Sequence, residues 1–281
     1  MEPQLRMATS QDAPLAGRIC HDAFKAIAEH HGFPPDFPSR EVATGLMENL
    51  VAHPGVHSVA AEVDGRLAGT NFLWERDEVA GVGPITVDPE LQNGAVGKSL
   101  MRAVLERAER KGFRAVRLVQ AAYHSRSLSL YTKLGFVARE PLAVLQGKPL
   151  AAGGARPAVE ADLAAANALC RRVHGHDRGE ELKQAIRAGS ATVTERDGRL
   201  AGYATEVGFF GHAVGETTAD LAALIAAAPA FTGPGFLVPM RNTGLFRWCL
   251  EQGLRVVQPM TLMSLGEYRE PRGAFLPSVL Y

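Results

Sequence analysis

Residues 92–99 read QNGAVGKS, a run of small residues that is followed by Lys98 and Ser99. Small side chains allow an anion to approach backbone N–H groups, and the first turn of a helix leaves such groups unpaired. The positive end of the helix dipole favours the same anion, and a lysine adds a mobile cation. The spacing therefore predicts a site for a phosphate-bearing ligand at the start of a helix.

Two kinds of phosphate site are compatible with these letters. The phosphate loop of ATP- and GTP-binding proteins has the pattern G-x-x-x-x-G-K-[ST] and directly follows a strand. Counting back from Gly97, the first glycine of that pattern falls on Gln92, and Val87 lies eight positions before Ala95. We also find no apolar strand that ends in an aspartate suited to hold Mg²⁺. The sequence disfavours a nucleotide phosphate loop.

The segment ITVDPELQNGAVGKSL resembles the acetyl-CoA signature of the Gcn5-related N-acetyltransferases, or GNAT family. That signature is a strand, a V-x-P turn and Q/R-x-x-G-x-G/A at the start of a helix. Val87-Asp88-Pro89 and Gln92-x-x-Ala95-x-Gly97 match it, except that alanine replaces a glycine at residue 95. The resemblance implies acetyl-CoA as co-substrate, with its pyrophosphate on Gln92, Asn93, Gly94, Ala95, Val96, Gly97 and Lys98.

A second segment, HSRSLSLYTKLGF at residues 124–136, resembles the family's N-x-x-A-x-x-L-Y-x-K-x-G-F segment. It follows the first motif after one predicted helix and one predicted strand. His124 stands at the usual asparagine position, where an imidazole can still donate a hydrogen bond to the cofactor. The resemblance places Tyr131 on a helix that lines the thiol end of CoA.

The reaction that the resemblance implies is direct transfer of an acetyl group from CoA to a primary amine. Ile85, Thr86 and Val87 would hold the thioester, and the Val87 N–H would polarise its carbonyl oxygen. Tyr131 is the candidate proton donor to the leaving thiolate. The general base is not assigned, although Glu75 and Glu78 could take a proton through water. A non-catalytic acyl-CoA sensor and an acyl-CoA enzyme with another reaction are the alternatives, because a fold does not fix a function.

The elements that position these residues follow from apolar periodicity and from turn signals. We expect a mixed α/β sheet in three layers, because a three-stranded stretch with a hairpin precedes a βαβα unit. FPPDFP separates the first two helices. The expected helices are 12–31, 39–52, 95–111 and 125–134, and the expected strands are 56–63, 66–74, 79–87, 115–121 and 136–145.

An internal repeat predicts two tandem GNAT-like domains. The hexamer DGRLAG occurs at 64–69 and at 197–202, and the segments around both copies correspond. We therefore expect domains at 1–147 and 155–281. In the second copy GHAVGETTADLAALI replaces the phosphate motif, and Glu216 and Asp220 are expected in the first helical turn, where carboxylates repel a pyrophosphate. Asn242 keeps the family asparagine, whereas Cys249 replaces the tyrosine. The second domain is expected to be a degenerate copy.

Composition limits the partners. The formal net charge is zero, with 30 basic and 30 acidic residues. Such a balance predicts no nucleic-acid or membrane partner. The resemblance implies a small-molecule or peptide amine as the acceptor, and the protein is expected to be a monomer or a homodimer. Three widely spaced cysteines predict buried, reduced thiols in a cytoplasmic protein. The scattered histidines predict no metal site. The apolar segment 273–281 is expected to dock on the protein as an extended chain.

Overall fold

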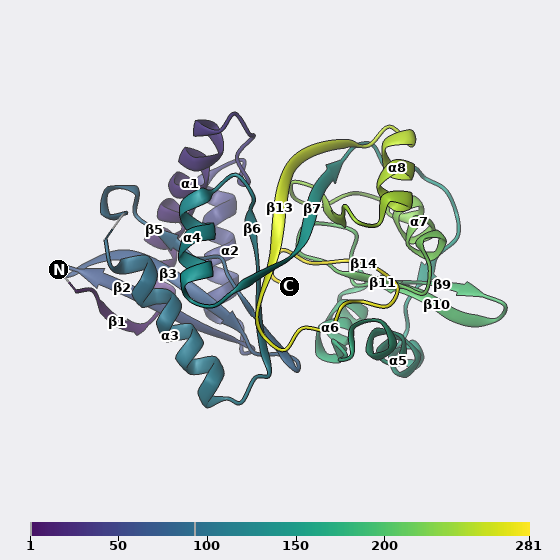
Figure 1. Ribbon diagram of the computed structural model, residues 1–281, viewed down its shortest axis with the longest axis horizontal. Coiled ribbons are helices and arrows are strands. Elements are labelled where there is room, and N and C mark those ends of the chain that lie inside the picture. The colour runs from purple at the N-terminus through teal and green to yellow at the C-terminus, as the bar shows by residue number, and fades with distance from the viewer. Residues whose placement is uncertain (1, 93) are drawn as a thin grey trace. The chain divides into compact units, whose positions relative to one another are not determined.

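The computed structural model describes residues 2–92 and 94–281. The chain forms two compact units, one of residues 1–118 with Leu280, the other of residues 119–279 with Tyr281. Figure 1 shows the elements of both units. No helix in the described part of the chain is long and apolar enough to cross a membrane.

The first unit is a sheet between two helical layers. Phe72 of β3 belongs to the cluster of α1 and α2, whereas the next residue back, Asn71, donates to the Leu100 carbonyl of α3 (3.4 Å). Adjacent strand residues point to opposite faces, so α3 covers the face opposite α1 and α2. The strand order is β1-β2-β3-β4-β6, with β5 also beside β3. The elements are β1 (Gln4–Met7), η1 (Ser10–Asp12), α1 (Ala13–His30), α2 (Arg40–Ala52), β2 (Val56–Val63), β3 (Arg66–Trp74), β4 (Val79–Val82), β5 (Thr86–Val87), η2 (Pro89–Leu91), α3 (Val96–Arg110) and β6 (Ala115–Ala121).

One expected strand of the first unit is two strands. Residues 79–87 were predicted as a single strand, but β4 ends at Val82 and β5 begins at Thr86. The interruption contains Pro84, which has no N–H for a ladder hydrogen bond. β4 pairs with β3 and with β6, whereas β5 pairs with β3 alone among the described strands. The outer edge of β5 is therefore not used by a strand.

The second unit repeats the three-layer arrangement. Its cluster around α5 and α6 includes Tyr203 of β10, while its cluster around α7 and α8 includes the neighbouring Ala204, which points to the other face. One sheet has the order β14-β11-β10-β9-β8. The elements are α4 (Ser125–Lys133), β7 (Val137–Gln146), β8 (Arg156–Pro157), η3 (Glu160–Asp162), α5 (Leu163–His174), α6 (Gly179–Ala188), β9 (Thr192–Arg196), β10 (Arg199–Ala204), β11 (Ala213–Gly215), α7 (Thr218–Ala227), β12 (Phe236–Pro239), α8 (Thr243–Glu251), β13 (Arg255–Gly266) and β14 (Ala274–Leu276).

The strand β7 lies among strands from later in the chain. It pairs with β12 on one side, Phe236 opposite Leu145, and with β13 on the other, Met260 opposite Leu142. The boundary between compact units consequently falls at residue 118, and not at the predicted seam of residues 147–155. Spatial compactness and sequence duplication are different properties, so the division into 1–147 and 155–281 stays a prediction about the repeat.

Local structure supports the proposed duplication. Asp64 and Asp197 of the two DGRLAG copies have positive φ values, 52° and 54°, each in a hairpin turn. Arg6 binds Asp12 before α1 (2.7 Å), as Arg156 binds Asp162 before α5 (2.8 Å).

Cys20, Cys170 and Cys249 are free and buried, as expected. The expectation that the segment 273–281 docks is confirmed, since residues 274–278 and Tyr281 are buried, but only Ala274–Leu276 are extended, as the strand β14 paired with β11.

Candidate functional site

The strand β5 directs the backbone of Val87 away from its partner β3. Gly69 lies opposite Val87, and Asp88 N donates to Ala68 O (2.8 Å). In an antiparallel ladder, hydrogen-bonded and non-hydrogen-bonded pairs alternate. Since Asp88 and Ala68 form a hydrogen-bonded pair, Val87 belongs to a non-hydrogen-bonded one, and both its N–H and its C=O face the outer edge of β5. An N–H in this position can donate to a carbonyl oxygen that approaches this edge.

The contact between β5 and β3 requires a glycine on β3. A Cβ on Gly69 would collide with the carbonyl oxygen of Thr86. The hydroxyls of Thr70 and Thr86 are buried 3.2 Å apart, so Thr86 faces the protein interior. Ile85, which was expected to belong to the same strand, precedes β5 and is half-buried.

The turn between β5 and α3 is tied back to the strand. The Asp88 carboxylate accepts from Glu90 N (3.0 Å), and Leu91 N donates to Asp88 O (2.8 Å). Gln92 Nε2 donates to Val87 O (3.2 Å). The Gln92 side chain therefore joins the expected thioester strand to the expected phosphate turn, a contact that sequence reasoning missed.

The N-terminus of α3 is suited to an anion. Its cap residue, Ala95, provides no side-chain cap, and the first turn of this helix contains no acidic residue. Gly94, Ala95 and Lys98 are exposed, Gly97 is half-buried, and Val96 is buried in the core. The first N–H groups of a helix have no intrahelical partners, so this end can accept a phosphate. Asn93 lies outside the described residues.

The corresponding end of α7 is closed by its own side chains. Gly202 of β10 lies opposite Gly215 of β11, as Gly69 of β3 lies opposite Val87 of β5. Strand pairing therefore aligns β11 with β5 and the start of α7 with the start of α3. Residues 88–95 separate β5 from α3, whereas only residues 216–217 separate β11 from α7. Asp220 accepts from Thr217 N (2.8 Å) and Thr217 Oγ1 (2.7 Å), which completes a capping box. No phosphate turn remains at this end.

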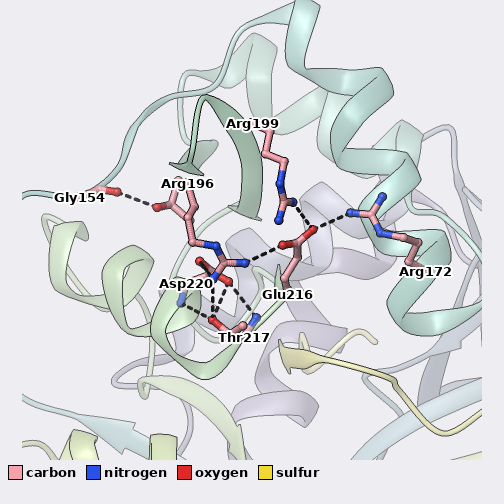
Figure 2. Close-up of polar contacts among 8 residues, drawn as sticks. Gly154, Arg172, Arg196, Arg199, Glu216, Thr217 and Asp220 are labelled. Atoms are coloured by element: carbon pink, nitrogen blue, oxygen red, sulfur yellow. Dashed lines mark hydrogen bonds and ion pairs between the residues drawn. The ribbon is translucent and has the colours of Figure 1, made fainter.

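Glu216 precedes the helix and does not belong to its first turn, which corrects the expectation. The helix begins at Thr218 because Thr217 caps it. Figure 2 shows three arginines directed at the Glu216 carboxylate: Arg172 (3.0 Å), Arg196 (2.7 Å) and Arg199 (2.6 Å). These hydrogen bonds, the one from Arg199 foremost, lower the pKa of Glu216 to about 2.

The second motif contributes a helix cap and a buried tyrosine, both in the second unit. His124 caps α4, with Nδ1 accepting from Ser127 N (3.4 Å), as Asn242 caps α8 by accepting from Leu245 N (3.1 Å). Tyr131 is buried, and its ring lies edge-on to Phe136. Burial raises the pKa of the Tyr131 hydroxyl above its ordinary value.

Neither carboxylate considered as a general base is unpaired. Arg107 donates to both oxygens of Glu75 (2.7 and 3.1 Å), and Arg114 pairs with Glu78 (2.5 Å). Despite an opposing effect of burial, the arginine contacts lower the pKa of Glu75, which makes it a weaker base. Within the described residues no three His, Cys, Asp or Glu side chains gather into a group that could hold a metal ion.

Comparison with known proteins shows a likeness over part of the chain. The model of the acetyltransferase (GNAT) family matches residues 24–136, which include β5, the turn and α3. This part of the chain is similar to the acetyltransferases of the GNAT family.

Two similar proteins are compared with this chain. A provisionally named ribosomal protein bS18-alanine N-acetyltransferase of Bacillus subtilis is 27% identical over 99 residues, 35% of this chain and 66% of that protein, just under two thirds of its length. A provisionally assigned acetyltransferase of Pyrococcus horikoshii shares the fold, with a TM-score of 0.75 and 18% identity over 98% of this chain and 94% of that one.

Proposed function

We propose that the chain is an acetyl-CoA-dependent N-acetyltransferase that acetylates a primary amine, with a single cofactor site at β5 and α3. One observation carries this proposal. The Val87 N–H faces the open edge of β5, and the helix that follows has an uncapped, acid-free N-terminus. A donor for a carbonyl oxygen thus precedes a cradle for a pyrophosphate along one short segment.

Acetyl-CoA, when bound, supplies the activated acetyl group as a thioester. Gln92, Gly94, Ala95, Val96, Gly97 and Lys98 would hold its pyrophosphate, with Asn93 assigned from the motif alone. Ile85, Thr86 and Val87 would line the acyl end. The Val87 N–H would stabilise the negative charge that develops on the carbonyl oxygen as the amine attacks.

Tyr131 is the proposed proton donor to the leaving thiolate. Burial raises its pKa, so the hydroxyl carries its proton throughout the neutral range. A donor must be protonated before it acts, and this environment meets that condition. The assignment of Tyr131 and of His124 to the cofactor rests on the second motif.

The acceptor is proposed by chemical class. The name of the Bacillus subtilis relative gives an alanine of ribosomal protein bS18 as its acceptor. An alanine-initiated peptide is therefore the first acceptor to test, beside small-molecule amines. We further propose that the protein works in the cytoplasm, as a monomer or homodimer, without nucleic acid or membrane. Its three buried free thiols suit a reducing compartment.

The test combines binding with turnover. Calorimetry with CoA should give one site per chain, and thiol release from acetyl-CoA should accelerate when a suitable amine is added. Alanine-initiated peptides, free amino acids and polyamines form the acceptor panel. Binding without turnover for every amine would favour the non-catalytic sensor. Absence of CoA binding would refute the proposed function.

A further inference from the structure

The peptide group between Val87 and Asp88 is bonded at both ends. Its N–H, from Asp88, donates to Ala68 O (2.8 Å), and its C=O, from Val87, accepts from Gln92 Nε2 (3.2 Å). The first bond belongs to the sheet. The second comes from the turn that leads into α3, so one peptide plane connects the sheet to the turn.

The preceding peptide group contains the proposed oxyanion donor. The Val87 N–H and the Thr86 C=O share this plane, and Thr86 lies opposite Thr70 on β3. The two peptide groups share the Val87 Cα, so anchoring the peptide group between Val87 and Asp88 limits the movement of the Val87 backbone that carries this N–H. β5 contains only two residues and has one partner strand in the described structure, so the ladder alone constrains it weakly.

We propose that Gln92 is a positioning residue: its side-chain amide fixes the Val87 carbonyl and thereby aims the Val87 N–H and sets its distance from the turn. This inference rests on the proposed function. It assigns the Gln92 side chain to the protein's own backbone, whereas the motif alone assigns residue 92 to the pyrophosphate. The two roles affect catalysis differently, because a cofactor contact supports binding and an aligned oxyanion donor supports the transition state.

Three substitutions separate these roles. Gln92→Met keeps the length of the side chain and removes the N–H donor. Gln92→Arg keeps a donor. Glu90→Gln, on the same turn with an exposed side chain, leaves both bonds of the peptide group intact and is the matched control.

The expected result is a split between kcat and affinity. In Gln92→Met, kcat should fall about tenfold while the Kd for CoA changes less than about twofold, the signature of a contact that matters only in the transition state. Glu90→Gln should keep kcat within about threefold of the wild type, and Gln92→Arg should recover most of the kcat that Gln92→Met loses. A loss in Gln92→Met that lies entirely in CoA affinity would overturn the proposal, as would an unchanged kcat.

A measurement without cofactor completes the test. Amide hydrogen exchange of the CoA-free protein should be faster at Asp88 in Gln92→Met by about tenfold, because the peptide group has lost one of its two bonds. Gln92→Arg should restore slow exchange. Equal exchange in all variants would refute the positioning role even if the wild type proved inactive. If the wild type fails to bind CoA but exchange at Asp88 is faster in Gln92→Met, the proposed function is refuted, and the positioning of the Val87 carbonyl by Gln92 still stands.

Discussion

At the scale of the residue, Gly97 tests the position of the cofactor. A leucine side chain in the first turn of α3 would occupy the space that a pyrophosphate needs beside the backbone. Gly97→Leu should weaken CoA binding at least tenfold, about 1.4 kcal/mol. Isothermal calorimetry measures this change. Gly153→Leu is the matched control, because Gly153 is exposed and a Cβ there meets nothing within 4 Å. Equal affinity in both variants would remove residues 92–98 from the cofactor site.

Tyr131 tests the chemistry of the leaving group. Tyr131→Phe keeps the ring and its edge-on contact with Phe136, but removes the proposed donor. We expect kcat to fall by about 10²-fold with little change in CoA affinity. In the wild type, burial raises the pKa of the hydroxyl above 10, so ionisation of Tyr131 should cause no loss of rate up to about pH 10. A wild-type kcat in Tyr131→Phe would make the tyrosine a packing residue only.

At the scale of the element, the Glu216 carboxylate just before α7 makes the free energy of unfolding depend on pH. Its arginine partners lower its pKa to about 2, from an ordinary value of 4.5. As the pH falls, Glu216 is therefore protonated in the unfolded chain at a higher pH than in the folded protein. The carboxylate contributes stability above pH 4.5 and loses the contribution as pH falls towards 2. Glu216→Gln should be less stable than the wild type at pH 7, and the two should converge near pH 2.

Denaturant unfolding at a series of pH values measures this difference. Glu216 is 19% exposed and its arginines are more so, so added salt should reduce the gap between variant and wild type. Glu251→Gln, at an exposed position of α8, provides the comparison. A constant difference across the whole pH range would mean that the arginines do not depress the pKa of this carboxyl.

Most elements of the first copy could be predicted from sequence because their signals are local. Periodicity and the DGRLAG hairpin gave residues 56–63, 66–74 and 115–121 with the observed bounds. The break at Pro84 and the cap at Thr217 were also local but were overlooked. In contrast, the Gln92–Val87 contact and the arginines on Glu216 depend on how strands and loops meet, and no periodicity carries that information.

At the scale of the whole molecule, the segment 274–281 contributes to stability. Val279 N donates to Phe209 O (2.9 Å), Ser278 Oγ donates to Phe210 O (3.0 Å), and the Tyr281 hydroxyl lies 2.8 Å from His176 Nε2. Deleting residues 278–281 should lower the free energy of unfolding by about 2–5 kcal/mol, since a buried aromatic ring and several hydrogen bonds are lost. Denaturant titration measures the loss.

Tyr281→Phe separates the two contributions to this loss. It keeps the ring beneath the Arg178 guanidinium and removes only the hydroxyl, so it should cost about 1 kcal/mol. Unchanged stability in the deletion variant would show that the segment rests on the surface without contributing to the fold.

The position of β7 affects how the protein is made. This strand ends at Gln146, and the later of its two neighbours, β13, ends at Gly266, 120 residues further on (266 − 146). At about 5–20 residues per second, a ribosome needs roughly 6–24 s to synthesise that interval. Until β12 (Phe236–Pro239) has been made, the apolar run Leu142–Leu145 has neither of the two strands that pair with it, and until the end of this interval it lacks β13. β7 thus cannot complete its pairing during translation until β13 has been made, and an apolar run that stays unpaired for seconds is the kind of surface that chaperones bind.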